Sequence, residues 1–176
     1  MVNMARRPES LQASDVAVAL RLALSGGDTY DQLADALGIA KSSAHRSVQR
    51  LEKAGLAVPE RREIMRPALR ELLAGGIRYV FYAEPGAEAP GIPTAHSAPP
   101  LSDELDFDRY YVWPSADGVV RGASVQPLLR SAPKLHQSEP ELYRALALVD
   151  AVRVGRARER NRAVELLDDL LVRGDD

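Results

Sequence analysis

The stretch of sequence that decides the fold runs from Gly38 to Leu56 and reads Gly38-Ile39-Ala40-Lys41-Ser42-Ser43-Ala44-His45-Arg46-Ser47-Val48-Gln49-Arg50-Leu51-Glu52-Lys53-Ala54-Gly55-Leu56. Gly38 predicts the end of one helix, because glycine adopts the left-handed conformation there at the lowest cost. The apolar residues that follow recur at helical spacing and predict a buried face made of Ala40, Ala44, Val48 and Leu51. The stretch therefore predicts a turn followed by an amphipathic helix that Gly55 closes.

The opposite face of this helix is cationic and hydrogen-bonding and carries no large apolar side chain. At about 100° per residue, it is formed by Ser42, Arg46, Gln49 and Lys53, flanked by His45 and Arg50. In the major groove of DNA, arginine can pair with guanine and glutamine with adenine. We therefore expect Arg46 and Gln49 to read bases. Contacts to phosphates or base edges are expected from Lys41, Ser42, Ser43 and Arg50, and His45 belongs to the same DNA-binding set.

A mixed polar face alone is more typical of an ordinary solvated helix. The preceding segment changes this interpretation, because residues 29–37 predict a short helix capped by Asp28 or Thr29. The small Ala34 on this helix allows a second helix to approach closely. A short helix, a small residue, a glycine turn and a second helix with a polar outer face together favour a helix-turn-helix.

This stretch resembles the winged helix-turn-helix regulators of the MarR and IclR kind, whose recognition helix ends in a pattern like Arg50-Leu51-Glu52-Lys53-Ala54-Gly55-Leu56. The resemblance covers roughly the first half of the chain. It implies a transcriptional regulator, expected here to be a repressor that binds double-stranded DNA as a homodimer, because one recognition helix reads only a few base pairs. The alternative is an antitoxin-type protein, whose winged helix represses its own operon while its C-terminal domain binds a partner protein.

The segment after the recognition helix departs from a plain winged helix. Residues 56–59 predict a short strand, residues 67–74 a helix with proline in its first turn, and residues 77–82 a β-branched and aromatic strand. A helix would then be inserted between the two strands of the wing. The arginines of this segment are expected either to contact phosphates or to form a solvated charged run; they are Arg61, Arg62 and Arg66.

The first helix is predicted to begin at Ser14 and to stop at Gly26-Gly27. It is nearly apolar all round, so we expect it to supply both a core and a surface for a second copy, together with the C-terminal helices. Arg6 and Arg7, which precede it, are possible contacts to the DNA backbone.

The second half of the chain begins with a change in composition. Residues 84–102 contain five prolines and two glycines, which predict a linker or an arm without regular structure. Ile92, His96 and Leu101 favour an ordered arm that packs along a surface over a flexible linker. A strand is then predicted over residues 110–114, joined to an apolar run from Val119 by an Asp-Gly hairpin turn. Two helices follow, separated by Gly155 and ending near Arg173.

The predicted fold class is therefore α+β. It comprises a winged helix-turn-helix over residues 1–84, a Pro-rich arm over residues 85–102, and a C-terminal dimerisation or partner domain over residues 103–176 with a small sheet and two helices. The C-terminal part resembles bacterial proteins that join a winged helix to an added domain, and this resemblance assigns no functional residue. It rests on Gly91-Ile92-Pro93-Thr94-Ala95-His96 and Val112-Trp113-Pro114.

The formal net charge is −2, yet charge is segregated along the chain. Residues 38–83 hold nine lysines and arginines and four glutamates, a net charge of +5. Residues 84–118 hold one arginine and seven acids, a net charge of −6. The basic segment suits contact with phosphates, which depends on the local field. Five arginines between residues 153 and 162 are expected to pair with the acids of residues 103–108; the alternative is a second nucleic-acid or acidic-partner contact.

Several classes of function are disfavoured. Cysteine is absent, and the three histidines, His45, His96 and His136, lie far apart without metal-ligand spacing. The acidic run at residues 103–108 lacks the spacing of a calcium loop. We expect no enzymatic activity, no cofactor and no metal. No apolar run approaches the ~20 residues of a membrane span, so a cytoplasmic protein is expected.

Overall fold

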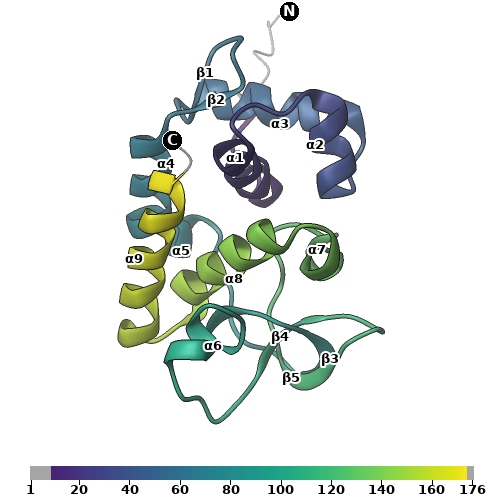
Figure 1. Cartoon of the computed structure of the whole chain (residues 1–176), viewed down its shortest axis with the longest axis vertical. Coiled ribbons are helices and arrows are strands. Elements are labelled where there is room, and N and C mark those ends of the chain that lie inside the picture. The colour runs from purple at the N-terminus through teal and green to yellow at the C-terminus, as the bar shows by residue number, and fades with distance from the viewer. Residues whose placement is uncertain (1–8, 174–176) are drawn as a thin grey trace, which may run out of the picture.

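The computed structural model describes residues 9–173. Its α+β fold confirms the predicted class, with a helical body and two small sheets, one two-stranded and one three-stranded. In Figure 1 the N-terminal helices and the small hairpin lie at the top, the long helix α8 (Pro140–Val154) crosses the middle, and the larger sheet lies at the bottom. Arg6 and Arg7 lie outside the described residues.

The helix-turn-helix forms as its local signals predict. It consists of α1 (Ala13–Ser25), α2 (Tyr30–Leu37) and α3 (Lys41–Lys53). Thr29 caps α2, because its hydroxyl accepts a hydrogen bond from the Gln32 amide while the Gln32 side chain accepts one from the Thr29 amide. Gly38 ends α2 in the left-handed conformation, with a φ of 62°.

The wing is a compact hairpin. Strands β1 (Ala57–Val58) and β2 (Glu63–Ile64) pair antiparallel, and the turn between them holds Glu60 and Arg62 at positive φ. The predicted second wing strand at residues 77–82 is wrong, because that segment begins with α5 (Ile77–Val80). The helix at residues 67–74 therefore follows the wing and is not inserted into it.

Helical spacing explains why residues 77–82 do not form a strand. Leu69, Leu73 and Ile77 recur every four residues and are all buried. They lie on one continuous helical path made of α4 (Arg66–Glu71), a π-helical turn at Leu72–Gly76, and α5. The burial of this helical face outweighs the β propensity of the aromatic residues, and the segment is therefore helical.

The Pro-rich segment contains a strand, which the sequence did not predict. Strand β3 (Glu88–Pro93) pairs with β5 (Val120–Ser124) through its first half and with β4 (Tyr111–Pro114) through its second half. The Pro90 carbonyl also accepts a hydrogen bond from the Ser115 amide at 3.0 Å, and proline is tolerated where no amide donor is required. The expected packing of this segment is correct, because it buries Ile92, His96 and Leu101.

The predicted hairpin between β4 and β5 is also wrong, because these two strands pair in parallel. Both are antiparallel to β3, so the chain crosses the edge of β3 between them. Gly118 lies at this crossing, where an added Cβ would come within 2.1 Å of the Gly91 nitrogen. The Asp117-Gly118 pair therefore marks a close crossing of two backbones.

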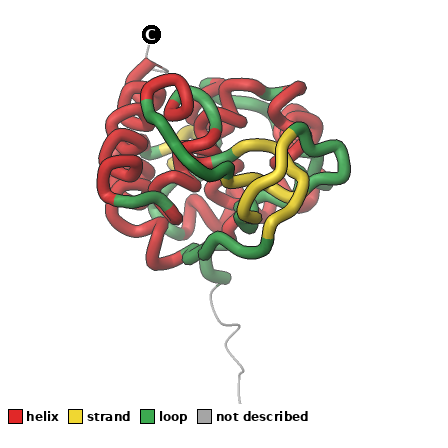
Figure 2. Tube along the Cα trace, turned by 90° about the horizontal axis from the view of Figure 1, so that it is seen from below, coloured by secondary structure: helices red, strands yellow, loops and turns green. Residues whose placement is uncertain are grey.

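The remaining helices enclose the core. They are α6 (Leu101–Glu104), α7 (Ala132–Ser138), which the sequence did not predict, α8, and α9 (Ala157–Arg173). Helix α8 packs against α1, α5, α7 and α9. Seen from below in Figure 2, the strands of the larger sheet gather on one side of this helical body.

Helix α1 was expected to offer an apolar surface to a second copy of the chain, and the structure does not leave such a surface exposed. Its residues from Val16 to Leu20 are buried within the protomer, between α3 and α8. They belong to one apolar cluster that also contains Leu51 of α3 and Leu146 of α8. In this conformation α1 has no apolar face left to offer a partner.

Candidate nucleic-acid interface

The outer face of α3 is exposed, as the predicted reading helix requires. The exposed side chains of this face are Ser42, His45, Arg46, Gln49 and Lys53. The inner face buries Ala44, Val48 and Leu51 in the core. The guanidinium of Arg46 and the amide of Gln49, one turn apart, therefore project into solvent from a helix that is fixed from behind.

A buried polar cluster fixes α3 to α1. The Arg50 guanidinium donates to both carboxylate oxygens of Asp15, at 2.8 and 2.7 Å, and the Ser47 hydroxyl donates to the same carboxylate at 2.6 Å. Arg50 is 6% exposed and Asp15 is fully buried. The hydrogen bond to Asp15 raises the pKa of Arg50, so the guanidinium stays charged. We therefore remove Arg50 from the predicted DNA contacts and assign it to the orientation of α3.

The start of α3 is tied to α2. The Lys41 ammonium lies 2.8 Å from the Asp31 carboxylate, and both side chains are exposed. The His45 ring packs against the Tyr30 ring with 4.7 Å between centroids. Ser43 is half-buried. Lys41, Ser42 and Ser43 lie on or beside the face that carries Arg46. To contact a phosphate, Lys41 would have to give up its ion pair with Asp31.

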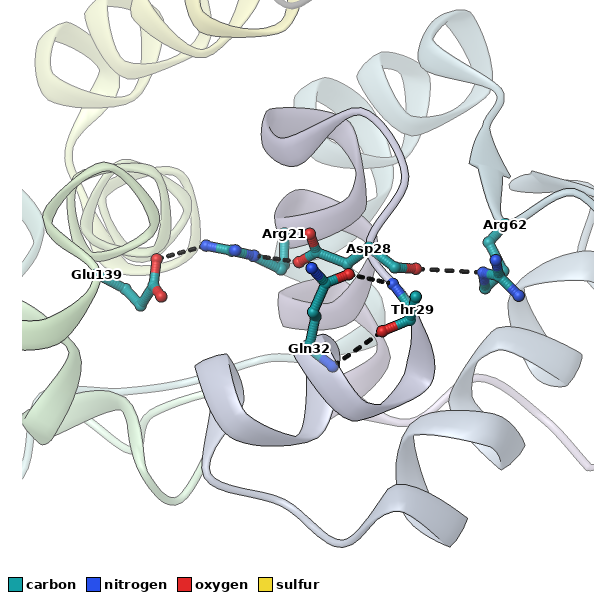
Figure 3. A network of polar contacts seen from close by, with 6 residues as sticks. All are labelled: Arg21, Asp28, Thr29, Gln32, Arg62 and Glu139. Carbon is teal, nitrogen blue, oxygen red and sulfur yellow. Dashed lines mark hydrogen bonds and ion pairs between the residues drawn. The ribbon is translucent and has the colours of Figure 1, made fainter.

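The three arginines of the wing segment have different surroundings. Arg61 is exposed at the turn. Arg62 lies over the Tyr30 ring at 5.1 Å, and its Nε donates to the Asp28 carbonyl at 3.1 Å (Figure 3). Arg66 donates to the carbonyls of Ala23 and Leu171. Arg61 is thus the arginine placed to reach a phosphate, while Arg62 holds the wing against α2.

The same network continues into the C-terminal half. Arg21 on α1 donates to the carboxylates of Asp28, at 2.6 Å, and of Glu139, which precedes α8 (Figure 3). Asp28 comes just before α2, and its backbone carbonyl also accepts a hydrogen bond from the Arg62 guanidinium. Figure 3 shows these side chains lying in one row between α8 and the wing. The row fixes the position of the wing relative to α8.

The arginines between residues 153 and 162 only partly follow the expectation. Arg162 pairs with Glu104 at 2.6 Å, as expected for an arginine that joins α9 to the acidic segment. Arg153 instead pairs with Asp150 on its own helix at 2.7 Å. The expected pairing with residues 103–108 is therefore confirmed for Arg162 and wrong for Arg153.

Asp150 is the centre of a second buried cluster, which the sequence analysis missed. Its carboxylate accepts hydrogen bonds from the Thr94 hydroxyl, at 2.8 Å, and the Trp113 indole, at 2.6 Å. Burial raises the pKa of Asp150, and the Arg153 charge opposes that rise. This cluster joins the sheet to α8. An available signal was the presence of two charged residues inside an otherwise apolar helical run.

The histidines and carboxylates of the described residues do not gather into a metal-binding group. In residues 9–173, no group of three or more histidine, aspartate or glutamate side chains is placed to hold a metal ion. His96 lies within the C-terminal half, where its Nε2 is 2.8 Å from the Arg109 carbonyl. None of the helices between residues 9 and 173 is long and apolar enough to cross a membrane.

Comparison with known proteins supports the helix-turn-helix. Residues 9–63 match the family model of the MarR family. The match runs from just before α1 to the start of β2, and thus covers α3 and the turn of the wing. No curated protein and no solved structure matches the chain. The match does not extend to residues 64–176.

Proposed function

We propose that the protein is a sequence-specific DNA-binding transcriptional regulator that acts as a homodimeric repressor. The observation that carries this proposal is the exposed polar face of α3, on a helix whose inner face is fixed by the core and by the Asp15–Arg50 pair. A rigid helix that projects Arg46 and Gln49 suits the major groove. The MarR family match over residues 9–63 supports the same function.

The proposed roles in DNA binding are assigned to side chains that are exposed or half-buried. Arg46 and Gln49 read bases, and the neighbouring contacts come from Lys41, Ser42, Ser43, His45 and Arg61. Residues 1–84 contain this reading surface, and the segments at 85–102 and 103–176 support it and complete the homodimer. Two recognition helices related by two-fold symmetry would read two half-sites about one helical turn apart.

The experiment that tests this function measures binding to the DNA upstream of the protein's own coding region. Fluorescence anisotropy with labelled duplexes would compare that region with a scrambled duplex of equal length. We expect the upstream duplex to bind roughly 10³-fold more tightly or better, as specific binding does. Equal affinity for both duplexes would contradict autoregulation, and failure to bind any duplex would contradict DNA binding itself.

Arg46→Ala should cost about 1–3 kcal/mol of binding free energy on the specific duplex and relax the preference at one base position of each half-site. The reason is that a bidentate contact between arginine and guanine is lost while the fold is untouched. Anisotropy against a panel of single-base variants measures both effects. Arg121→Ala is the matched control, since Arg121 is an exposed arginine on β5, in the sheet at the opposite end of the molecule (Figure 1). Unchanged affinity for Arg46→Ala would remove α3 as the reading helix.

Binding should weaken steeply with salt although the net charge is −2. Each phosphate neutralised contributes about −0.9 to the slope of log K against log salt, so a dimer with a few contacts per subunit should give a slope of roughly −4 to −8. Arg61→Ala should reduce this slope by about 1 per subunit and leave the base preference intact. A parental slope in the Arg61→Ala variant would show that the wing lies off the DNA.

A further inference from the structure

An apolar ridge is formed by exposed side chains at the end of α5 and just after it. Tyr79, Val80 and Tyr82 are 72%, 59% and 65% exposed, whereas Ile77 on the same segment is buried. Three large exposed apolar side chains thus lie within four residues of the chain, and exposed apolar surface of this kind often marks an interaction site. The Arg78 guanidinium lies over the Tyr79 ring at 5.1 Å, which helps to hold that ring in place.

A groove lies directly beside this ridge. It has a volume of about 860 Å³, and Val80, Phe81 and Tyr82 are among the residues that line it. The rest of its lining combines apolar residues with polar and charged ones. The apolar ones include Pro114, Pro127, Leu128 and Pro133, and the polar ones include Gln12, Ser14, Gln126, Arg130 and Arg153. The groove has room for aromatic side chains, and it shares Val80 and Tyr82 with the ridge, so that ridge and groove adjoin.

The charges on this face are opposite in sign and separated. Glu84 is exposed at the end of the ridge, and its carboxylate accepts a hydrogen bond from the Tyr82 hydroxyl, which raises the pKa of Tyr82. Arg130 is exposed and is one of the residues that line the groove. Within residues 9–173, no carboxylate forms an ion pair with Arg130. The face therefore carries a carboxylate, Glu84, at the end of the ridge and a guanidinium, Arg130, at the groove.

We propose that this face binds the same face of a second copy of the chain, so that the ridge of each copy enters the groove of the other. A two-fold interface is self-complementary: whatever residue i contacts on the partner, the partner's residue i contacts in return. A ridge beside a groove, and Glu84 opposite Arg130 of the partner subunit, satisfy this condition in shape and in charge. The occupant of the groove is the partner's ridge.

The surface available agrees with this arrangement. Two tyrosines and a valine at these exposures offer roughly 350 Å² of side chain, about half of the ~800 Å² that each partner gives to a standard interface. The remainder would have to come from other residues of this face, Glu84 and Arg130 among them. The other exposed large apolar residues among residues 9–173 do not form a comparable run along the chain: they are Met65, Tyr110, Val119 and Val172. The buried α1 offers no alternative face.

This inference rests on the proposed function only in that a homodimer is expected there, and it is tested without DNA. Sedimentation equilibrium of the full chain should show a reversible dimer. Val80→Asp should raise the dimer dissociation constant by about 10-fold or more, because it places a charge in the centre of the contact. Val172→Asp is the matched control, since Val172 is 60% exposed at the far end of α9, and it should leave the dissociation constant unchanged.

A charge exchange makes the test independent of folding. Glu84→Arg and Arg130→Glu should each weaken the dimer, and the double variant should restore most of the affinity, because it recreates the pair with its signs reversed. A monomeric parent, a dimer unaffected by Val80→Asp, or no recovery in the double variant would overturn the proposed face. Dissociation by Val172→Asp would assign the contact to α9. If the parent binds no DNA yet shows this sedimentation pattern, the proposed function fails and the interface stands.

Discussion

The Arg50→Ala variant is expected to lose about 3–5 kcal/mol of its free energy of unfolding, because it leaves the Asp15 carboxylate buried without its charge partner. Asp15 is fully buried, and Arg50 supplies two of its hydrogen bonds. Small domains are stable by only about 5–15 kcal/mol, so this loss is a large share of the total. Urea unfolding followed by circular dichroism measures it.

Two controls separate this effect from DNA contact. Ser47→Ala removes one hydrogen bond to the same carboxylate and should cost only about 1.5–3 kcal/mol. Arg46→Ala, four residues earlier on the exposed face, should leave the unfolding midpoint almost unchanged. If Arg50→Ala unfolded at the parental urea concentration and lost affinity for DNA, Arg50 would be a DNA contact after all.

Asp150→Ala should be about as damaging, with an expected loss of about 3–5 kcal/mol, because the Arg153 cation then remains buried and unpaired. The Trp113 indole and the Thr94 hydroxyl also lose their acceptor. Urea unfolding gives the free energy. The fluorescence of Trp113, the single tryptophan of the chain, reports the same site, and its emission should shift as the indole hydrogen bond is lost.

Matched variants show where this loss originates. Trp113→Phe removes one donor to the carboxylate and should cost less than Asp150→Ala. The double variant Asp150→Ala and Arg153→Met removes both charges, and it should recover much of the loss, because the penalty comes from the charge left alone. A double variant no more stable than Asp150→Ala would contradict this account and would indicate that the hydrogen bonds dominate.

The helix-turn-helix could be predicted from the sequence because its signals are local. The Thr29 cap, the Gly38 turn and the spacing of Ala44, Val48 and Leu51 act within a few residues of each other. The same holds for Gly155, which separates α8 from α9 as expected. Such signals determine a helix and its buried face before any distant contact is known.

The C-terminal sheet could not be predicted because its determinants are distant in sequence. Pro90 and Pro93 argue against a strand until the pairing of β3 is known, and that pairing depends on residues 112–123. Gly118 resembles a hairpin residue until the crossing over Gly91 is seen. Pairing of strands across such separations leaves no periodic signal in either segment.

The candidate site was predictable in its outline and not in its individual roles. Helical periodicity placed Arg46, Gln49 and Arg50 at or beside one polar face. It could not distinguish Arg50 from the other two, because that depends on Asp15, a residue 35 positions earlier in the sequence. Arg62 likewise resembled Arg61 until Tyr30 and Asp28 were found beside it. Long-range partners decide which arginine is structural.

The contact between α1 and α8 also bears on how this chain could be reused in engineering. Helix α1 lies between the recognition helix and α8, with its residues from Val16 to Leu20 shared by one core. A truncation near residue 84 would remove α8 and expose the face of α1 that α8 covers. We therefore expect that residues 9–84 cannot be transferred to another protein as an isolated DNA-binding domain. Fusions that exchange DNA preference should instead retain the whole scaffold and replace only the outward side chains of α3.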